Sequence, residues 1–199
     1  KPIIAVKAGR SLVGARAASS HTGALAASDV AVDALFRNAG VIRVTTIEEM
    51  FNACPVLTNQ PLPKGPRVAL LTNAGGPGVL AADACEGLGL KVIPLSEATQ
   101  ARLRSFLPKA AAVTNPVDMI ATAPPEAFKN CLSALLEDPG VDSVIVIYIP
   151  PLVTKPEDVA AAVNAVLKDY KGDKPVVTCF MMSEAATEGI RKNSKLRPF

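Results

Sequence analysis

The stretch Val144-Ile145-Val146-Ile147-Tyr148-Ile149, which stops at Pro150-Pro151, decides the fold of this chain. A strand that is apolar on both faces is covered on both faces, and this is the environment of a parallel sheet between two layers of helices. The run is far shorter than the roughly 20 apolar residues that a membrane span needs. It therefore predicts a buried strand of a doubly wound α/β domain.

The second part of the chain alternates strand-like and helical patterns around this stretch. Its four strand-like runs are Arg67–Leu71, Lys91–Ile93, Ser143–Tyr148 and Pro175–Phe180. Two helical stretches each carry one apolar stripe, made of Phe128, Leu132, Leu135 and Leu136 in the first and of Val159, Val163, Val166 and Tyr170 in the second. Such spacings predict helices that bury one face against the sheet.

The first part of the chain has fewer elements. Its strand-like runs are Ile3–Val6 and Val41–Val44, with a helix at 28–38 between them. Ser28 or Asp29 can cap the start of that helix, and Gly40 can end it. Thr46, with Glu49 three residues later, has the capping-box pattern that opens a further helix. Two strands and two helices are too few for a domain, so we expect the C-terminal part of a second α/β domain.

The segment between the two parts predicts a linker. Thr58 to Pro66 contains three prolines in nine residues, which exclude regular structure. We therefore expect a partial domain at 1–57, a linker at 58–66 and a doubly wound α/β domain at 67–199. Because the chain opens directly on a strand at Lys1, without Met, we also expect it to be a piece of a longer polypeptide.

Composition excludes several classes of function. The chain has 21 basic and 18 acidic residues without a dense run, and only 4% aromatic residues, so neither a basic stripe nor stacking aromatics favour nucleic acid. Cys54, Cys85, Cys131 and Cys179 lie far apart, which favours buried, reduced thiols over a zinc site or a disulfide framework. We expect a cytoplasmic protein with no membrane segment and no bound metal.

His21 is the only histidine in the sequence. It follows two serines and precedes Thr22-Gly23, and we expect the small residues from Gly9 to Gly23 to form a loop that can move the ring. A largely neutral imidazole, with a reference pKa of about 6.5, can attack phosphorus. The alternatives are a surface histidine or a histidine that caps a helix.

A second candidate site follows the strand at 67–71. In Thr72-Asn73-Ala74-Gly75-Gly76-Pro77-Gly78 a buried strand enters a turn of small residues and then a helix, with Pro77 in its first turn. Free backbone N–H groups there favour a phosphate ion, so we expect Asn73, Ala74, Gly75, Gly76 and Gly78 to bind phosphate or sulfate. The motif is neither a Walker A loop nor GxGxxG. The alternative is a glycine turn that serves tight packing alone.

A third motif, Asn115-Pro116-Val117-Asp118, places polar side chains near the same expected edge of the sheet. Asn115 and Asp118 can line the site. The alternative, which the pattern favours, is an Asx-type turn in which Asp118 fixes the backbone.

These segments together resemble the NDP-forming acyl-CoA synthetases, which include ADP-forming acetyl-CoA synthetase and succinyl-CoA synthetase. Residues 1–10, Ser20-His21-Thr22-Gly23-Ala24 and Ala39-Gly40-Val41 resemble the end of the histidine-bearing domain of that family. The TNAGGPG motif at 72–78, Asn115–Asp118 and Val141–Val144 resemble the flavodoxin-like domain that follows it. The resemblance covers nearly the whole chain in the order of the family.

The resemblance implies a phosphohistidine relay with His21 as the phosphorylated nucleophile. It implies that the turn at Gly75, Gly76 and Gly78 is one of two facing helix N-termini that cap the phosphoryl group. It also implies partners, namely CoA-binding and ATP-grasp domains or subunits, and the use of acyl-CoA, phosphate, CoA, ADP or ATP and Mg²⁺. Because those domains and the acidic residue that supports the histidine have no counterpart here, we expect this chain alone to be inactive.

Two other functions stay open from sequence. An acyl-CoA-synthetase-like region can sense a metabolite for a protein acyltransferase, and an α/β module can serve interaction alone. The presence of His21 favours the ligase. Neither the acid that is activated nor the oligomeric state follows from the residues, and a homo-oligomer stays open.

Overall fold

The computed structural model describes residues 2–22 and 28–183, with His21 and Thr22 described by their backbone alone. The chain divides into two compact units, Lys1–Gln60 and Pro61–Phe199. The division falls inside the proline-rich segment.

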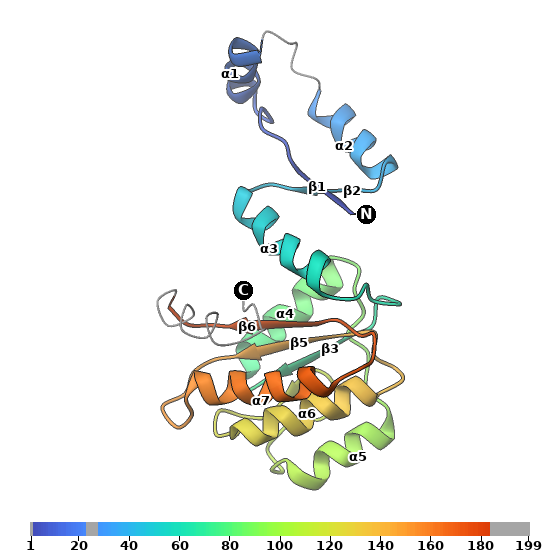
Figure 1. The fold of residues 1–199 in the computed structure, drawn as a ribbon, viewed down its shortest axis with the longest axis vertical. Helices are drawn as coiled ribbons and strands as arrows, with labels where there is room; N and C mark the ends of the chain where they lie inside the picture. The colour runs from blue at the N-terminus through green and yellow to red at the C-terminus, as the bar shows by residue number, and fades with distance from the viewer. Residues whose placement is uncertain (1, 23–27, 184–199) are drawn as a thin grey trace. The chain divides into compact units, whose positions relative to one another are not determined.

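The second unit contains a parallel sheet with the strand order β4-β3-β5-β6 (Figure 1). Its strands are β3 (Val68–Thr72), β4 (Val117–Asp118), β5 (Ser143–Tyr148) and β6 (Val176–Phe180). Its helices are α4 (Gly75–Gly87), α5 (Glu97–Phe106), α6 (Pro125–Glu137) and α7 (Pro156–Asp169). One apolar cluster joins the sheet to α5, α6 and α7, and another joins it to α4. The sheet therefore carries helices on both faces, which confirms the doubly wound α/β fold.

The core of this unit uses the two stripes that the sequence predicted. All four stripe residues of α6 are buried, as are Val159 and Val163 of α7, whereas Val166 and Tyr170 are half-buried. Tyr148 of β5 packs against the rings of Phe128 and Phe180, at centroid distances of 5.6 and 5.2 Å. These contacts bind α6 to the middle of the sheet.

The prediction of a strand at 91–93 is wrong. Only Lys91 pairs with the sheet, through a single bridge to Arg67. Beyond it, the side-chain amide of Asn115 lies along the edge of β3, where its Oδ1 accepts from Leu70 N (3.0 Å) and its Nδ2 donates to the carbonyls of Val68 and Ile93 (2.9 Å each). A side chain thus replaces the hydrogen bonds that a neighbouring strand would have made.

The first unit contains β1 (Ile3–Val6) and β2 (Val41–Val44), which pair in parallel with Ile3 opposite Val41. Its helices are α1 (Leu12–Thr22), α2 (Asp29–Asn38) and α3 (Ile47–Asn59). The capping box of Thr46 and Glu49 is confirmed, because Thr46 Oγ1 accepts from Glu49 N (3.0 Å) and the Glu49 carboxylate accepts from Thr46 N. No side chain is fully buried within residues 2–20 and 28–60.

The start of α2 differs from the prediction. Ser28 is the N-cap residue, but its side chain makes no capping hydrogen bond. Asp29 instead pairs with Arg43 of β2, and Arg43 also pairs with Asp33 one turn later (3.0 Å). Hydrogen bonds from this guanidinium lower the pKa of both carboxyl groups. Ion pairs to β2, rather than a cap, hold the first turns of α2.

The prediction of a loop from Gly9 to Gly23 is also wrong, since residues 12–22 form α1. Ser11 opens this helix, because its Oγ accepts from Gly14 N (3.1 Å) and its carbonyl accepts from Ala15 N (2.8 Å). The alanines that follow are strong helix formers. A serine cap followed by alanines therefore outweighs the single internal glycine.

Candidate functional site

The glycine turn lies at the carboxyl edge of the sheet, where β3 ends at Thr72 and α4 begins at Gly75. Thr72 is fully buried, and its Oγ1 both accepts from Ala74 N (3.0 Å) and donates to Ala74 O (3.1 Å). The turn is therefore held by its own strand. In an open parallel sheet, this edge is where ligands bind.

Two amide groups of the turn are available to a ligand. Gly75 and Gly76 are exposed and occupy the first turn of α4, where N–H groups have no partner within the helix. No acceptor for them occurs among residues 2–22 and 28–183. The dipole of α4 adds a partial positive charge at this point. Ala74 N and Gly78 N, in contrast, already donate to Thr72 Oγ1 and Ala74 O.

The three glycines differ in what a side chain would meet at each position. A Cβ on Gly78 would lie 3.0 Å from Thr72 Cγ2, so Gly78 allows the helix to pack closely on the strand. A Cβ on Gly75 would lie 3.0 Å from Asp118 Oδ2. A Cβ on Gly76 would meet nothing within 4 Å. Packing alone thus accounts for Gly78 but not for Gly76.

Asn73 uses its side chain within the fold. It is 1% exposed, its Nδ2 donates to Ile149 O (2.8 Å), and its Oδ1 accepts from Ile149 N (2.9 Å). These bonds join the ends of β3 and β5. Asn73 positions the turn, and its role as a phosphate ligand stays a prediction.

The Asn115–Asp118 motif divides into two roles. Asn115 is engaged along the edge of β3, as described above. Asp118 pairs with Thr72 across β3 and β4, and its Oδ1 accepts from Ile120 N (2.9 Å), which is the Asx-type turn that the sequence favoured. Its second oxygen, Oδ2, faces Gly75. Asp118 therefore lies beside the glycine turn, whereas Asn115 builds the sheet.

His21 lies in the last turn of α1, in the first unit. Its imidazole ring and residues 23–27 lie outside the described part of the structure. The prediction that His21 carries a phosphoryl group therefore stays a prediction.

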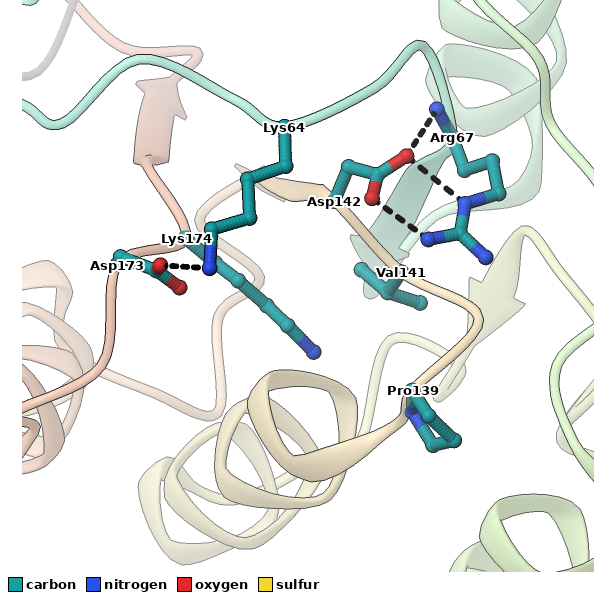
Figure 2. A pocket seen from close by; sticks show the side chains of 7 residues that line it. All are labelled: Lys64, Arg67, Pro139, Val141, Asp142, Asp173 and Lys174. Atoms are coloured by element: carbon teal, nitrogen blue, oxygen red, sulfur yellow. Dashed lines mark hydrogen bonds and ion pairs between the residues drawn. The ribbon is translucent and has the colours of Figure 1, made fainter.

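Sequence reasoning missed a charged cavity at the opposite edge of the sheet (Figure 2). It has a volume of about 170 Å³ and is lined by Lys64, Arg67, Pro139, Val141, Asp142, Asp173 and Lys174. Asp142 accepts from Arg67 N, Nε and Nη2 at 3.0, 2.8 and 2.7 Å, and Lys64 pairs with Asp173. Hydrogen bonds from Arg67 lower the pKa of Asp142 to about 2. Most of the charged side chains that line the cavity form ion pairs with one another. We therefore assign them a structural role.

The cysteines are free thiols, and only Cys85 and Cys131 are fully buried, whereas Cys54 and Cys179 are half-buried. Burial raises the pKa of Cys131 to about 12. Among the described residues, no group of three or more His, Cys, Asp or Glu side chains could hold a metal ion. In the same part of the chain, no helix has the length and apolar character needed to cross a bilayer.

Two protein families match the chain. Residues 1–57 match the family described as "Succinyl-CoA ligase like flavodoxin domain", and residues 68–191 match the family described as "Ligase-CoA domain". The second match covers more than half of the sequence. The chain belongs to the Ligase-CoA domain family. The part of the chain that matches this family, residues 68–191, contains the glycine turn and the Asn115–Asp118 motif.

Several of the similar proteins are ADP-forming acetate–CoA ligases, and another is an ADP-forming 4-hydroxybutyrate–CoA ligase. The alpha subunit of acetate–CoA ligase [ADP-forming] II from Pyrococcus furiosus is 48% identical over an alignment of 198 positions, which covers 97% of this chain and 43% of that subunit. Acetate–CoA ligase [ADP-forming] I from Archaeoglobus fulgidus is 41% identical over 96% of this chain and 26% of its own length. The chain thus spans less than half of each of these relatives.

A solved structure has the same fold. The dinucleotide forming acetyl-coenzyme A synthetase 1 of Ca. Korarchaeum cryptofilum, in complex with phosphate and ADP, superposes with a TM-score of 0.90 at 33% sequence identity. The similarity covers 97% of this chain and 42% of that one. It confirms the succinyl-CoA-synthetase-like α/β fold.

Proposed function

We propose that this chain is part of an ADP-forming acyl-CoA ligase that interconverts acyl-CoA, ADP and phosphate with acid, CoA and ATP. The observation that carries the proposal is the glycine turn, whose exposed Gly75 and Gly76 amides open a helix at the carboxyl edge of a Ligase-CoA domain. The 48% identity to an acetate–CoA ligase subunit supports it. These relatives are ligases, so we propose catalysis rather than metabolite sensing.

In the proposed relay, His21 carries the phosphoryl group between two reactions. Phosphate first displaces CoA from acyl-CoA, which gives an acyl phosphate. A ring nitrogen of His21 then attacks phosphorus, and the bond to the acyl oxygen breaks, so that the acid leaves as a carboxylate. An oxygen of the ADP β-phosphate attacks next, and the phosphorus–nitrogen bond breaks to give ATP and free His21.

The glycine turn stabilises the phosphoryl group on His21 in this scheme. Phosphoryl transfer depends mainly on positioning and on charge stabilisation, and backbone amides at a helix N-terminus supply both. One helix end contributes roughly 0.3–1 kcal/mol of favourable dipole interaction, and more in partly buried geometry. Gly75 and Gly76 present their amides without side chains that would hold the phosphoryl group away.

The remaining ligands belong to partner domains in this proposal. Following the family resemblance, we place the nucleotide and its Mg²⁺ on an ATP-grasp partner and CoA on a CoA-binding partner. The chain alone is then inactive, and activity requires the full-length protein with its partners.

The test is to incubate the full-length protein and its partners with radiolabelled phosphate and acetyl-CoA, and to map the label. We expect an acid-labile, base-stable phosphate on His21, which ADP removes as ATP. His21→Asn should abolish both the label and ATP formation. A wild-type protein that forms ATP without label on His21 contradicts the relay, and one that neither forms ATP nor takes up label with acetyl-CoA or with any of a set of other acyl-CoAs contradicts the ligase.

A further inference from the structure

Lys174 is the one cation in the lining of the charged cavity of Figure 2 that forms no ion pair with a described residue. Its Nζ donates to the carbonyl of Asp138 (2.5 Å), which occupies one of the three N–H groups of the ammonium. The carboxylate of Asp138 accepts from Ser96 N (2.9 Å) and Gly140 N (2.7 Å), and Asp138 does not line the cavity. Lys174 is half-buried, and burial lowers its pKa although nearby carboxylates oppose this. A half-buried ammonium thus has no carboxylate partner among the described side chains.

The cavity walls also have unused donors and an excess of positive charge. Three cationic and two anionic side chains line the cavity, which leaves a net charge of +1. Arg67 donates to Asp142 through Nε and Nη2, so its Nη1 has no acceptor in the described part of the chain. The other walls are Pro139 and Val141, which are apolar. The volume of about 170 Å³ far exceeds the roughly 10–15 Å³ that one water molecule needs. The space therefore suits a ligand of several atoms that carries one negative charge and an apolar part.

We propose that this cavity binds a small monocarboxylic acid, with Lys174 as the residue that holds its carboxylate. The carboxylate accepts from the ammonium in a charge-assisted hydrogen bond, and the guanidinium of Arg67 adds positive charge beside it. The apolar tail of the acid lies against Val141 and Pro139. A monoanion neutralises the excess charge, whereas a dianion such as sulfate leaves a net negative charge beside the two carboxylates of the lining. The cavity lies at the opposite edge of the sheet from the glycine turn, so the inference does not depend on the proposed function.

The experiment titrates acetate or sulfate into the ¹⁵N-labelled 199-residue chain at pH 7 and constant ionic strength. The shifts of the Val141 and Asp142 amides report binding, because both residues line the cavity. Lys174→Met removes the ammonium and keeps an apolar stem, and Lys174→Arg keeps a positive charge. Lys171→Met makes the first of these changes at an exposed position three residues earlier and is the matched control.

We expect acetate to shift both amides of the wild-type chain with a saturable dependence on concentration, and sulfate to bind more weakly. Lys174→Met should weaken acetate binding about tenfold, because a hydrogen bond from a charged donor is lost. Lys174→Arg should retain most of the affinity, and Lys171→Met should retain all of it. The inference is overturned if the shifts grow linearly with acetate, if Lys174→Met binds acetate as the wild type does, or if sulfate binds more tightly than acetate. Lys174→Gln, which keeps an N–H donor without the charge, replaces Lys174→Met if that variant does not fold.

Discussion

The glycines of the turn differ in whether packing accounts for them. Gly78 is buried against Thr72, whereas Gly76 faces open space. The sequence motif contains both glycines and cannot tell them apart, because their surroundings come from β3 and from the Pro116 segment. Substitutions at the two positions should therefore have different effects.

Gly78→Ala should lower the free energy of unfolding by about 1–3 kcal/mol, because the added methyl group overpacks the contact with Thr72. Gly76→Ala should be neutral or stabilising by roughly 0.5–1 kcal/mol, since alanine favours the helix and its methyl group meets nothing. Urea unfolding of both variants measures the difference. Equal losses at the two positions would show that the packing described for Gly78 is wrong.

Asp142 should give the fold a dependence on pH. Its pKa is about 2 in the folded chain, because Arg67 donates three hydrogen bonds to it, against about 3.9 in an unfolded chain. Since the folded value is the lower one, the ionised carboxylate stabilises the fold above about pH 4. This contribution disappears as the pH falls from about 4 towards 2.

Asp142→Asn should lower the free energy of unfolding at pH 7 by about 1–3 kcal/mol, because bonds to a charged acceptor are lost. It should also flatten the pH dependence of stability below pH 4. Thermal unfolding between pH 2 and pH 7 measures both effects. Asp169 is exposed, and Asp169→Asn is the matched control. If Asp169→Asn flattens the pH dependence of stability as much as Asp142→Asn does, the role of Asp142 is contradicted.

At the scale of elements, local patterns predicted most helices and strands. The strand at 143–148 was predicted to the residue, because it is strongly apolar and bounded by polar residues and prolines. The helix α1 was missed, because its cap, Ser11, precedes a segment whose glycine and serines also suit a loop. The strand predicted at 91–93 failed, because the amide that replaces its hydrogen bonds comes from Asn115, more than 20 residues away.

Asn115→Ala tests this replacement of a strand by a side chain. Leu70 N and Val68 O would lose their partners at the edge of β3, so we expect a loss of roughly 2–4 kcal/mol in the free energy of unfolding. Hydrogen exchange at Leu70 N should also become faster. Asn164→Ala, on α7, should change neither quantity. Protection of Leu70 that survives in Asn115→Ala would contradict the account.

At the scale of the whole molecule, sequence and structure support different parts of the account. The sequence identified the family resemblance and both candidate segments, since the histidine and the glycine turn are local motifs. It could not assign Asn73 and Asn115 to structural roles, because their bonds join residues 45 or more positions apart, to Ile149 in one case and to Leu70 in the other. The two segments belong to separate units, so the proposed relay requires them to meet in the full-length protein.

The most direct test of that meeting is a crystal structure of the full-length protein, with its partners, phosphorylated on His21. We predict that oxygens of the phosphoryl group accept hydrogen bonds from Gly75 N and Gly76 N. A phosphorylated His21 whose phosphoryl group makes all its hydrogen bonds elsewhere, with both glycine amides left to solvent, would contradict the central claim.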